Sequence, residues 1–160
     1  MTELALPAGS LQSALAAFEH GADAVYLGLQ QFSARKGAVN FSFSDLAKLK
    51  GCLPPGKKFY VTVNTLVSDH ELADVEALLR QIAYFEPDGA IVQDLGIANI
   101  IAERFSGTIP LHGSTQLAAH TAAGVRTMQS MGFSRVVLSR ELTLPEIAAI
   151  RSECPDIELK

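Results

Sequence analysis

Short apolar runs alternate along the chain with longer stretches in which apolar residues recur at helical spacing. The clearest run is KFYVTV at residues 58–63, whose β-branched and aromatic side chains favour a strand. Proline, glycine and polar residues separate the apolar runs from the helical stretches. The pattern predicts strands at residues 4–6, 24–27, 58–63, 90–92, 110–112, 135–138 and 157–159.

The helical stretches carry recognisable start and stop signals. Ser10 is placed to cap the first helix and Gly21 to end it. Ser68 and Glu71 have the spacing of a capping box before a long helical stretch. The predicted helices cover residues 11–20, 44–53, 71–85, 95–105, 117–131 and 144–154, with Asp94 as the expected cap of the fourth.

Six strand–helix units followed by a lone seventh strand predict a single α/β domain over residues 1–160. Each unit takes about 25 residues, close to the spacing of a (β/α)8 barrel. An open doubly wound sheet is the alternative, but neither GxGxxG nor a Walker A motif is present. We therefore expect an incomplete TIM-barrel-like domain, the N-terminal portion of a longer barrel protein.

The ends of such an incomplete barrel carry a further expectation. The sequence stops inside a predicted strand, as a truncated chain would. The first and last strands would then have unpaired edges, and such edges favour association. We expect either a homo-oligomer formed through these edges or a displaced helix that covers one of them.

Composition narrows the class of protein. Hydrophobic residues make up 48% and charged residues 19%, which excludes a disordered chain. No apolar stretch approaches the ~20 residues of a membrane-spanning helix, and no basic segment precedes an apolar run at the start, so we expect no secretory signal. Two cysteines without CxxC spacing fit a reduced, cytoplasmic protein. The net charge of −4 argues against a nucleic-acid platform made by this stretch alone.

Polar residues follow nearly every predicted strand at its carboxyl end, where parallel βα folds carry their function. The amino ends of the strands are less rich in such residues. This asymmetry is the sequence evidence for a site. Its candidates are Arg35 and Asn40 after the second strand, Asn64 after the third, Asp94 after the fourth, His112, Ser114 and Gln116 at the fifth, and Arg140 and Glu141 after the sixth.

Several of these candidates have an equally good structural interpretation. Asp94 suits a helix cap as well as a functional carboxylate. A histidine at a strand end, such as His112, can titrate or bind a ligand, but a lone histidine is more often structural. Arg35 lies between two phenylalanines, which suits an anionic or planar ligand or simply a solvated loop.

No metal site and no activated nucleophile is predicted. His112 and His120 do not have a metal-ligand spacing, and HExxH is absent. Neither a GxSxG elbow nor a Ser–His–Asp order can be defended.

Several segments, taken together and in order, resemble the N-terminal part of the collagenase-like peptidase family U32. They are LPAGS at 6–10, GADAVYLG at 21–28, FxxRxxAxNF at 32–41, YVTVNT at 60–65, HGSTQ at 112–116 and VVLSREL at 136–142. Each is weak alone, but six in sequence order are specific. DxEL at 69–72 and IVQDLGI at 91–97 resemble the branch linked to cytidine hydroxylation in large-subunit ribosomal RNA.

The resemblance implies a TIM-barrel-like catalytic domain. Many members are thought to hydroxylate RNA bases or ubiquinone precursors without oxygen, with prephenate implicated for RNA. Members typically place a cysteine cluster beyond the segment matched here, and it holds an iron–sulfur cluster. We therefore expect no cofactor in this stretch, an iron–sulfur cluster in the full-length protein, and RNA and a small anion such as prephenate as its partners. This stretch alone would be inactive.

The matched segments contain all the candidate site residues except Asp94, which lies in the branch-specific segment. The best catalytic candidates are His112, Asp94 and Glu141. The expected substrate-binding residues are Arg35, Asn40, Asn64, Ser114, Gln116 and Arg140.

Three functions remain open at this point. The first is part of an iron–sulfur hydroxylase of RNA bases. The second is a collagenase-like peptidase, because some members were named for collagen degradation. The third is a non-catalytic binding domain of this length.

Overall fold

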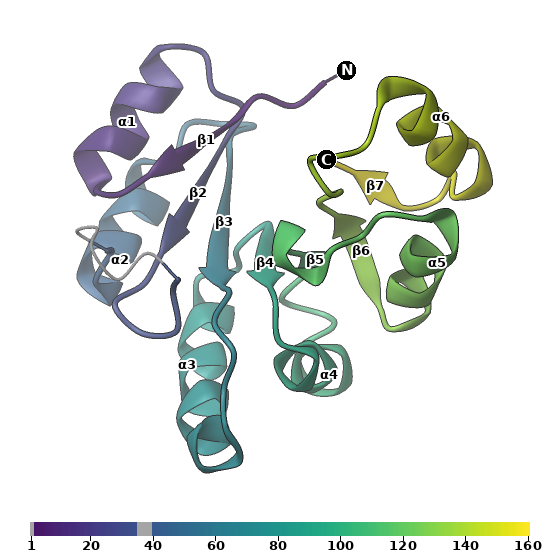
Figure 1. Ribbon diagram of the computed structural model, residues 1–160. Helices are drawn as coiled ribbons and strands as arrows, with labels where there is room; N and C mark the ends of the chain where they lie inside the picture. The colour runs from purple at the N-terminus through teal and green to yellow at the C-terminus, as the bar shows by residue number, and fades with distance from the viewer. Residues whose placement is uncertain (1, 35–39) are drawn as a thin grey trace.

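The computed structural model describes residues 2–34 and 40–160 of the chain, and its centre is one parallel sheet (Figure 1). Neighbouring strands in the sheet follow one another in sequence, in the order β1 to β7, and every pair is parallel. The strands are β1 (Ala5–Ala8), β2 (Ala24–Gly28), β3 (Lys58–Val63), β4 (Gly89–Val92), β5 (Leu111–Gly113), β6 (Phe133–Val136) and β7 (Glu158–Leu159).

Figure 1 shows the sheet curling around an open centre, with the helices along its outer side. The helices are α1 (Leu11–Glu19), α2 (Phe43–Cys52), α3 (Leu72–Tyr84), α4 (Leu95–Arg104), α5 (Ala122–Ser130) and α6 (Leu144–Glu153), with short 3-10 turns η1 (Asp69–Glu71) and η2 (Thr115–Leu117). This arrangement confirms the prediction of an incomplete TIM-barrel-like domain. The edges of the described sheet are β1 and β7, and association through them stays a prediction.

Alternation along the strands divides the buried residues between two faces. On β3, Phe59, Val61 and Val63 are buried with the apolar residues of the surrounding helices, such as Leu46 of α2. The intervening residues of the strand point to the inner face, because successive side chains of a strand alternate. The core therefore lies between the sheet and the helices, and the inner face is left for polar groups.

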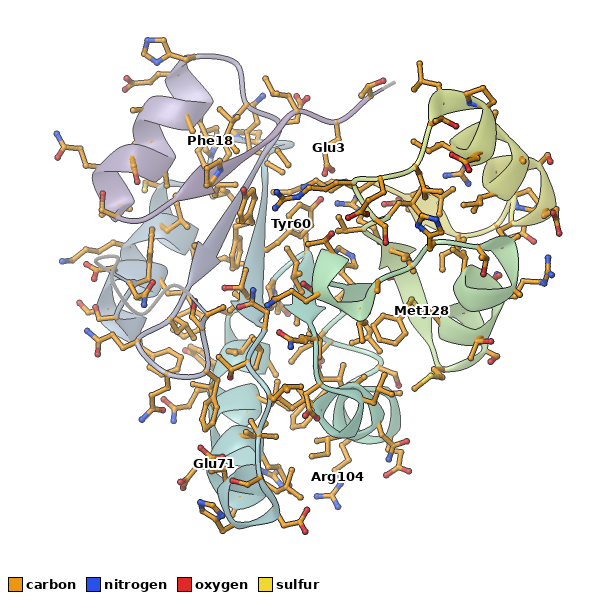
Figure 2. The ribbon with its side chains drawn as sticks, viewed as in Figure 1. Glu3, Phe18, Tyr60, Glu71, Arg104 and Met128 are labelled. Atoms are coloured by element: carbon orange, nitrogen blue, oxygen red, sulfur yellow. The ribbon has the colours of Figure 1, made fainter. Side chains whose placement is uncertain are left out.

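The inner face carries a cluster of ionic and polar side chains, here called the inner charged cluster: Glu3, Lys58, Tyr60, Arg135 and Glu158. Arg135 donates to Glu3 Oε1 at 2.9 Å and to Glu158 Oε2 at 2.6 Å. The hydroxyl of Tyr60 donates to Glu3 Oε2 at 2.7 Å, and the Arg135 guanidinium lies 4.8 Å from the centroid of the Tyr60 ring. Glu3, which precedes β1, is thereby tied to β3 and β6; Figure 2 labels Glu3 and Tyr60.

Burial and hydrogen bonds within this cluster shift the pKa values of its side chains. Burial disfavours the charged form of Glu3, but hydrogen bonds from Tyr60 and Arg135 outweigh it and hold the Glu3 pKa below its ordinary value. Burial and the hydrogen bond to Glu3 raise the pKa of Tyr60. Burial also disfavours the charge of Arg135, but its carboxylate partners raise its pKa. Glu3 and Arg135 are therefore a charged pair at neutral pH.

The helix predicted over 117–131 is wrong in its first third, because α5 begins only at Ala122. The 3-10 turn η2 ends at Ala118, which has a φ of 53°, and Ala119 then forms a bridge with Leu138. The helix begins only after Thr121, whose side chain accepts a hydrogen bond from the backbone N–H of Gly124. Helical spacing could not show this break, because it depends on a long-range contact in which the backbone N–H of Ser139 donates to the carbonyl of Ala119 at 2.8 Å.

Other boundaries differ by one or two residues. Ser42, not Ser44, caps α2, because its side chain accepts from the backbone of Asp45. The sixth strand starts at Phe133, not Arg135. The predicted strand over 58–63 and the cap at Asp94 are confirmed. In the described residues, no helix has the length and apolar character needed to cross a membrane.

Candidate functional site

A cavity of about 520 Å³ opens at the carboxyl end of the sheet, where several strands deliver polar residues. Most of these residues are uncharged donors and acceptors, namely Ser33, Asn40, Thr62, Asn64, Ser114, Thr115 and Gln116. The charged residues among those that line it are Arg140 and Lys160, which are both cations. The cavity therefore suits a ligand with many hydrogen-bonding groups and a negative charge.

Three polar side chains of the cavity, those of Asn64, Ser114 and Gln116, are joined by hydrogen bonds. Asn64, just after β3, donates from Nδ2 to Oε1 of Gln116 at 3.2 Å and accepts from the backbone N–H of Ala34 at 3.1 Å. The hydroxyl of Ser114 donates to the same Gln116 oxygen at 3.3 Å. These contacts fix both amide groups, so their remaining donors and acceptors have defined positions for a ligand.

A close backbone approach shapes one wall of the cavity. A β-carbon on Gly28 would lie 2.2 Å from Oγ of Ser33, so only glycine fits at the end of β2. The buried hydroxyl of Ser33 lies 3.4 Å from that of Thr62, which donates to the carbonyl of Leu27 at 3.2 Å. This wall is therefore built jointly by β2, β3 and the loop after β2.

Two cations reach the cavity from the last strands. The ammonium of Lys160 lies 5.2 Å from the centroid of the Tyr26 ring. Burial lowers the pKa of Lys160, and the nearby positive charge of Arg135 lowers it further. Arg140, which follows β6, is exposed at the cavity. Sequence analysis anticipated Arg140 but missed Lys160.

His112 is on β5, but its ring does not line the cavity. The side chain is buried, with 4% of its surface exposed, and its ring centroid lies 5.1 Å from that of Tyr60. Burial, assisted by the charge of Arg135, lowers the His112 pKa to about 3, so the imidazole is neutral at pH 7. Among the described residues, its Nδ1 is a buried side-chain atom without a hydrogen-bond partner. A catalytic role for His112 stays a prediction.

The remaining sequence candidates are dispersed. Asp94 caps α4 by accepting from the backbone of Ile97 at 3.0 Å, and its other oxygen accepts from Val67 at 3.4 Å. Glu141 is exposed, and neither it nor Asp94 lines the cavity. Arg35 lies outside the described residues. Of the nine candidates, the structure brings five to the cavity: Asn40, Asn64, Ser114, Gln116 and Arg140.

Strand alternation could have found two residues that sequence analysis missed. Tyr60 and Thr62 alternate along the strand with the apolar residues Phe59, Val61 and Val63, so a common inner face is implied. No strand alternation could predict that Ser33 lines the cavity, because its position depends on the path of the loop after β2. Arg135 begins the strand predicted over 135–138, at the end of the sheet where the sequence indicates no site, yet it is the centre of the inner charged cluster.

The cysteines do not form a metal centre. Cys52 is exposed at the end of α2, whereas Cys154 is buried at the end of α6 and contacts the carbonyl of Ala122. Within residues 2–34 and 40–160, no three His, Cys, Asp or Glu side chains are grouped as metal ligands. An iron–sulfur cluster requires several thiolates at close spacing, so the residues of this chain do not fit one.

Comparison with known sequences agrees with the motif pattern. A family model described as Peptidase family U32 matches residues 9–160. The chain is 40% identical over 159 residues to "tRNA hydroxylation protein P" of Haemophilus influenzae, covering 99% of this chain and 34% of that protein. It is 39% identical over 149 residues to "23S rRNA 5-hydroxycytidine C2501 synthase" of Escherichia coli, covering 92% and 22%. A "Collagenase" of Porphyromonas gingivalis is 33% identical over 150 residues, with coverage of 92% and 35%.

Comparison with solved structures supports the fold. The U32 peptidase Mk0906 superposes with a TM-score of 0.81 at 16% identity, covering 99% of this chain and 67% of that one. A phosphonopyruvate hydrolase superposes with a TM-score of 0.62 at 15% identity, covering 98% and 65%. At these identities the likeness concerns the fold alone. The chain spans about a third or less of the length of the curated relatives named above, the H. influenzae, E. coli and P. gingivalis proteins.

Proposed function

Since this chain belongs to peptidase family U32, we propose that it forms the substrate-binding part of an enzyme that hydroxylates bases in RNA. The observation that carries the proposal is the cavity of fixed amides and hydroxyls, found in a chain about 40% identical to proteins named for tRNA and rRNA hydroxylation. The sequence identities to the tRNA and rRNA hydroxylation proteins are nearly equal, at 40% and 39%. Both tRNA and rRNA are therefore examined in the test.

The chemistry of the cavity suits a nucleobase. Asn and Gln amides can donate and accept at the same time, which matches the edge of a base. A base within a helix is not accessible to an enzyme's reactive groups and must leave the stack to enter a pocket. Asn64 and Gln116 are hydrogen-bonded to each other. Their free donors and acceptors would therefore already be in position when a base enters the cavity. The cavity volume of about 520 Å³ lies within the range of small-molecule sites.

Arg140 and Lys160 support the proposal of a small anionic cosubstrate such as prephenate. Both line the same cavity, and no acidic residue lies with them among its lining residues. A carboxylate there would be attracted by two cations and could accept hydrogen bonds from both. RNA phosphates would need further basic surface, because the chain itself has a net charge of −4.

An iron–sulfur cluster in the whole protein is a separate proposal. Cys52 and Cys154 lie at the ends of different helices and do not form a ligand set. A cluster would therefore take its thiolates from outside this chain. No step of the reaction is assigned through it.

The peptidase alternative finds less support in the cavity. Ser114, one of the described serines that line the cavity, donates to the Gln116 amide and not to a base. A serine nucleophile needs a base within hydrogen-bonding distance, and His112 makes no hydrogen bond through Nδ1. Hydroxylation is therefore the favoured activity.

The proposal is tested by deleting the gene in its host and restoring it in full, either wild type or as Asn64→Ala or Gln116→Ala. Nucleosides from purified tRNA and from the large ribosomal RNA are then analysed by mass spectrometry. We expect one hydroxylated nucleoside to disappear on deletion and to return with the wild-type gene. Each variant should reduce it by about tenfold or more, since a bidentate amide contact contributes about 1–3 kcal/mol.

Gln129→Ala is the matched control for Gln116→Ala, because Gln129 is exposed on α5, far from the cavity lining. It should restore the modification fully. An unchanged nucleoside profile after deletion, together with gelatin hydrolysis by the purified full-length protein that Ser114→Ala abolishes, would establish the peptidase instead.

A further inference from the structure

A second cavity, of about 420 Å³, adjoins the first at the carboxyl end of the sheet and shares Ser33 and Asn40 with it. We call it the side cleft. One wall is the start of the loop after β2, with Gln30, Gln31 and Phe32, and the other is the loop after β3, with Thr65 and Leu66. The loop after β3 lines both cavities, since Asn64 lies in the first and Leu66 in the side cleft. Two ligands that filled the two cavities would therefore be neighbours.

Phe32 holds an unfavourable backbone conformation in the first wall. Its φ is 55°, in the left-handed region that a bulky residue rarely adopts. The next residue, Ser33, is buried against Gly28 and Thr62, which fixes the chain there. Strained residues of this kind persist where the surrounding structure determines them, and they gather at ligand sites.

The opposite wall presents an apolar side chain to solvent. Leu66 is 70% exposed although it is large and hydrophobic. Its loop is anchored directly after Leu66, because the Val67 backbone donates to Asp94 at 3.4 Å and the Ser68 backbone donates to Glu71 at 2.9 Å. A fixed loop that holds a leucine in water beside a polar cavity is suited to contact the flat face of a ligand.

The charges of the side cleft are opposite to those of the first cavity. Among the described residues that line it, the charged ones are Glu71 and Asp74, both acidic. Carboxylates disfavour a phosphate or a carboxylate as the ligand, and Asp74 can accept a hydrogen bond from an exocyclic amino group. The exposed amides of Gln30 and Gln31 add donors and acceptors. The side cleft is thus suited to an uncharged ring with polar edges.

We infer that the side cleft binds the nucleobase next to the one that enters the first cavity, with Leu66 against its face and Gln31 at its edge. The inference rests on the proposed function and adds to it a source of sequence preference. Contact with the face of a base tolerates every base, whereas contact with its edge distinguishes them. Leu66 would then set affinity for the flanking nucleotide and Gln31 its identity.

The test uses the full-length protein and RNA oligonucleotides that copy the modified site, with each of the four nucleotides placed in turn on either side of the target. Hydroxylated product is measured by mass spectrometry, and kcat/KM is compared across the set. We expect the wild type to prefer one neighbour. Gln31→Ala should bring the best and worst neighbours to within about twofold. Leu66→Ala should lower kcat/KM about 5- to 100-fold for all neighbours, mainly through KM, as loss of the apolar contact of one leucine side chain would.

Two controls separate binding from folding. Gln129→Ala and Leu144→Ala remove an exposed amide and an 82% exposed leucine at other places, and both should behave as wild type. The inference is overturned if Gln31→Ala keeps the neighbour preference, if Leu66→Ala acts on kcat alone, or if the wild type has no preference. Failure of the wild type to modify any RNA would instead refute the proposed function, and this inference with it.

Discussion

The imidazole of His112 lies against the backbone of Gly89 on the adjacent strand. A β-carbon on Gly89 would fall 2.3 Å from Cε1 of the ring and within 2.7 Å of both ring nitrogens. The glycine and the histidine therefore depend on each other, because the ring occupies the space that any other residue at position 89 would need. Tyr60, whose ring centroid lies 5.1 Å from that of His112, limits movement on the other side.

Gly89→Ala should therefore destabilise the protein, by about 1–3 kcal/mol as is usual for overpacking. The double variant Gly89→Ala/His112→Ala should be more stable than the sum of the two single changes predicts, because removing the ring makes room for the new methyl group. Urea denaturation of the four proteins measures the coupling. Strictly additive free energies of unfolding would contradict the contact.

The buried neutral state of His112 predicts a pH dependence of stability. Its folded pKa of about 3 is below the ordinary value of 6.5. Below pH 6.5 the unfolded chain binds a proton that the folded chain does not, so the free energy of unfolding falls as the pH drops toward 3. The loss approaches about 1.4 kcal/mol per pH unit from this group. The charged groups that act on it are Arg135, Glu3, Lys160 and Lys58.

His112→Phe should remove that slope between pH 6.5 and 5, where most carboxylates remain ionised. His20→Phe is the control, because His20 is exposed at the end of α1, and it should retain the slope. Denaturant midpoints measured at several pH values would show both results. An equal slope in the His112 variant and the wild type would assign the pH dependence to other groups.

Arg135 should contribute more to stability than any exposed arginine. Its side chain is 10% exposed, and Arg135→Ala leaves Glu3, itself 23% exposed, without its main partner. We expect a loss of roughly 2–4 kcal/mol, toward the range for a broken buried pair. Arg126→Ala breaks a pair in which both side chains are about half exposed and should cost less than about 1 kcal/mol. Comparable losses in the two variants, measured by chemical denaturation, would argue against the inner charged cluster as a stabilising unit.

Asp94 allows its two interpretations to be separated. Asn is as good an N-cap as Asp, whereas Ala lacks the side-chain acceptor. Asp94→Ala should lower the free energy of unfolding by about 1 kcal/mol or more, while Asp94→Asn should stay close to wild type. Because Asp94 does not line the cavity, the Asn variant should also restore RNA modification. A stable Asn variant that fails to restore it would give Asp94 the catalytic role predicted from the sequence.

The fold was predictable from local signals, because each strand pairs with the next one in the chain. Regular alternation of strand and helix then determines the architecture without any long-range information. The exception was the segment from Ala118 to Thr121, where helical spacing continues but a left-handed residue interrupts it. Its tertiary bridge to Leu138 has no counterpart in local sequence.

The candidate site was predictable where it follows directly from strand ends. Asn64, Ser114 and Gln116 were found because the carboxyl ends of parallel strands converge. His112 shows the limit of that rule. It sits near the end of β5, but its ring points to the interior beside Tyr60 and not into the cavity. Lys160 was missed because its contribution depends on the curl of the sheet, which brings β7 toward Tyr26 of β2.

The pair of Glu3 and Arg135 spans 132 residues of chain, whereas all strand pairings join consecutive strands. On the ribosome, Glu3 leaves the exit tunnel before its partner, which follows only after the five strands β1 to β5 have been made. The sheet can grow one strand at a time during that interval, since each new strand finds its neighbour already present. The segment that carries Glu3 must wait until β6 has been synthesised, so this ion pair forms only after the intervening strands exist and its formation reports that the sheet has curled.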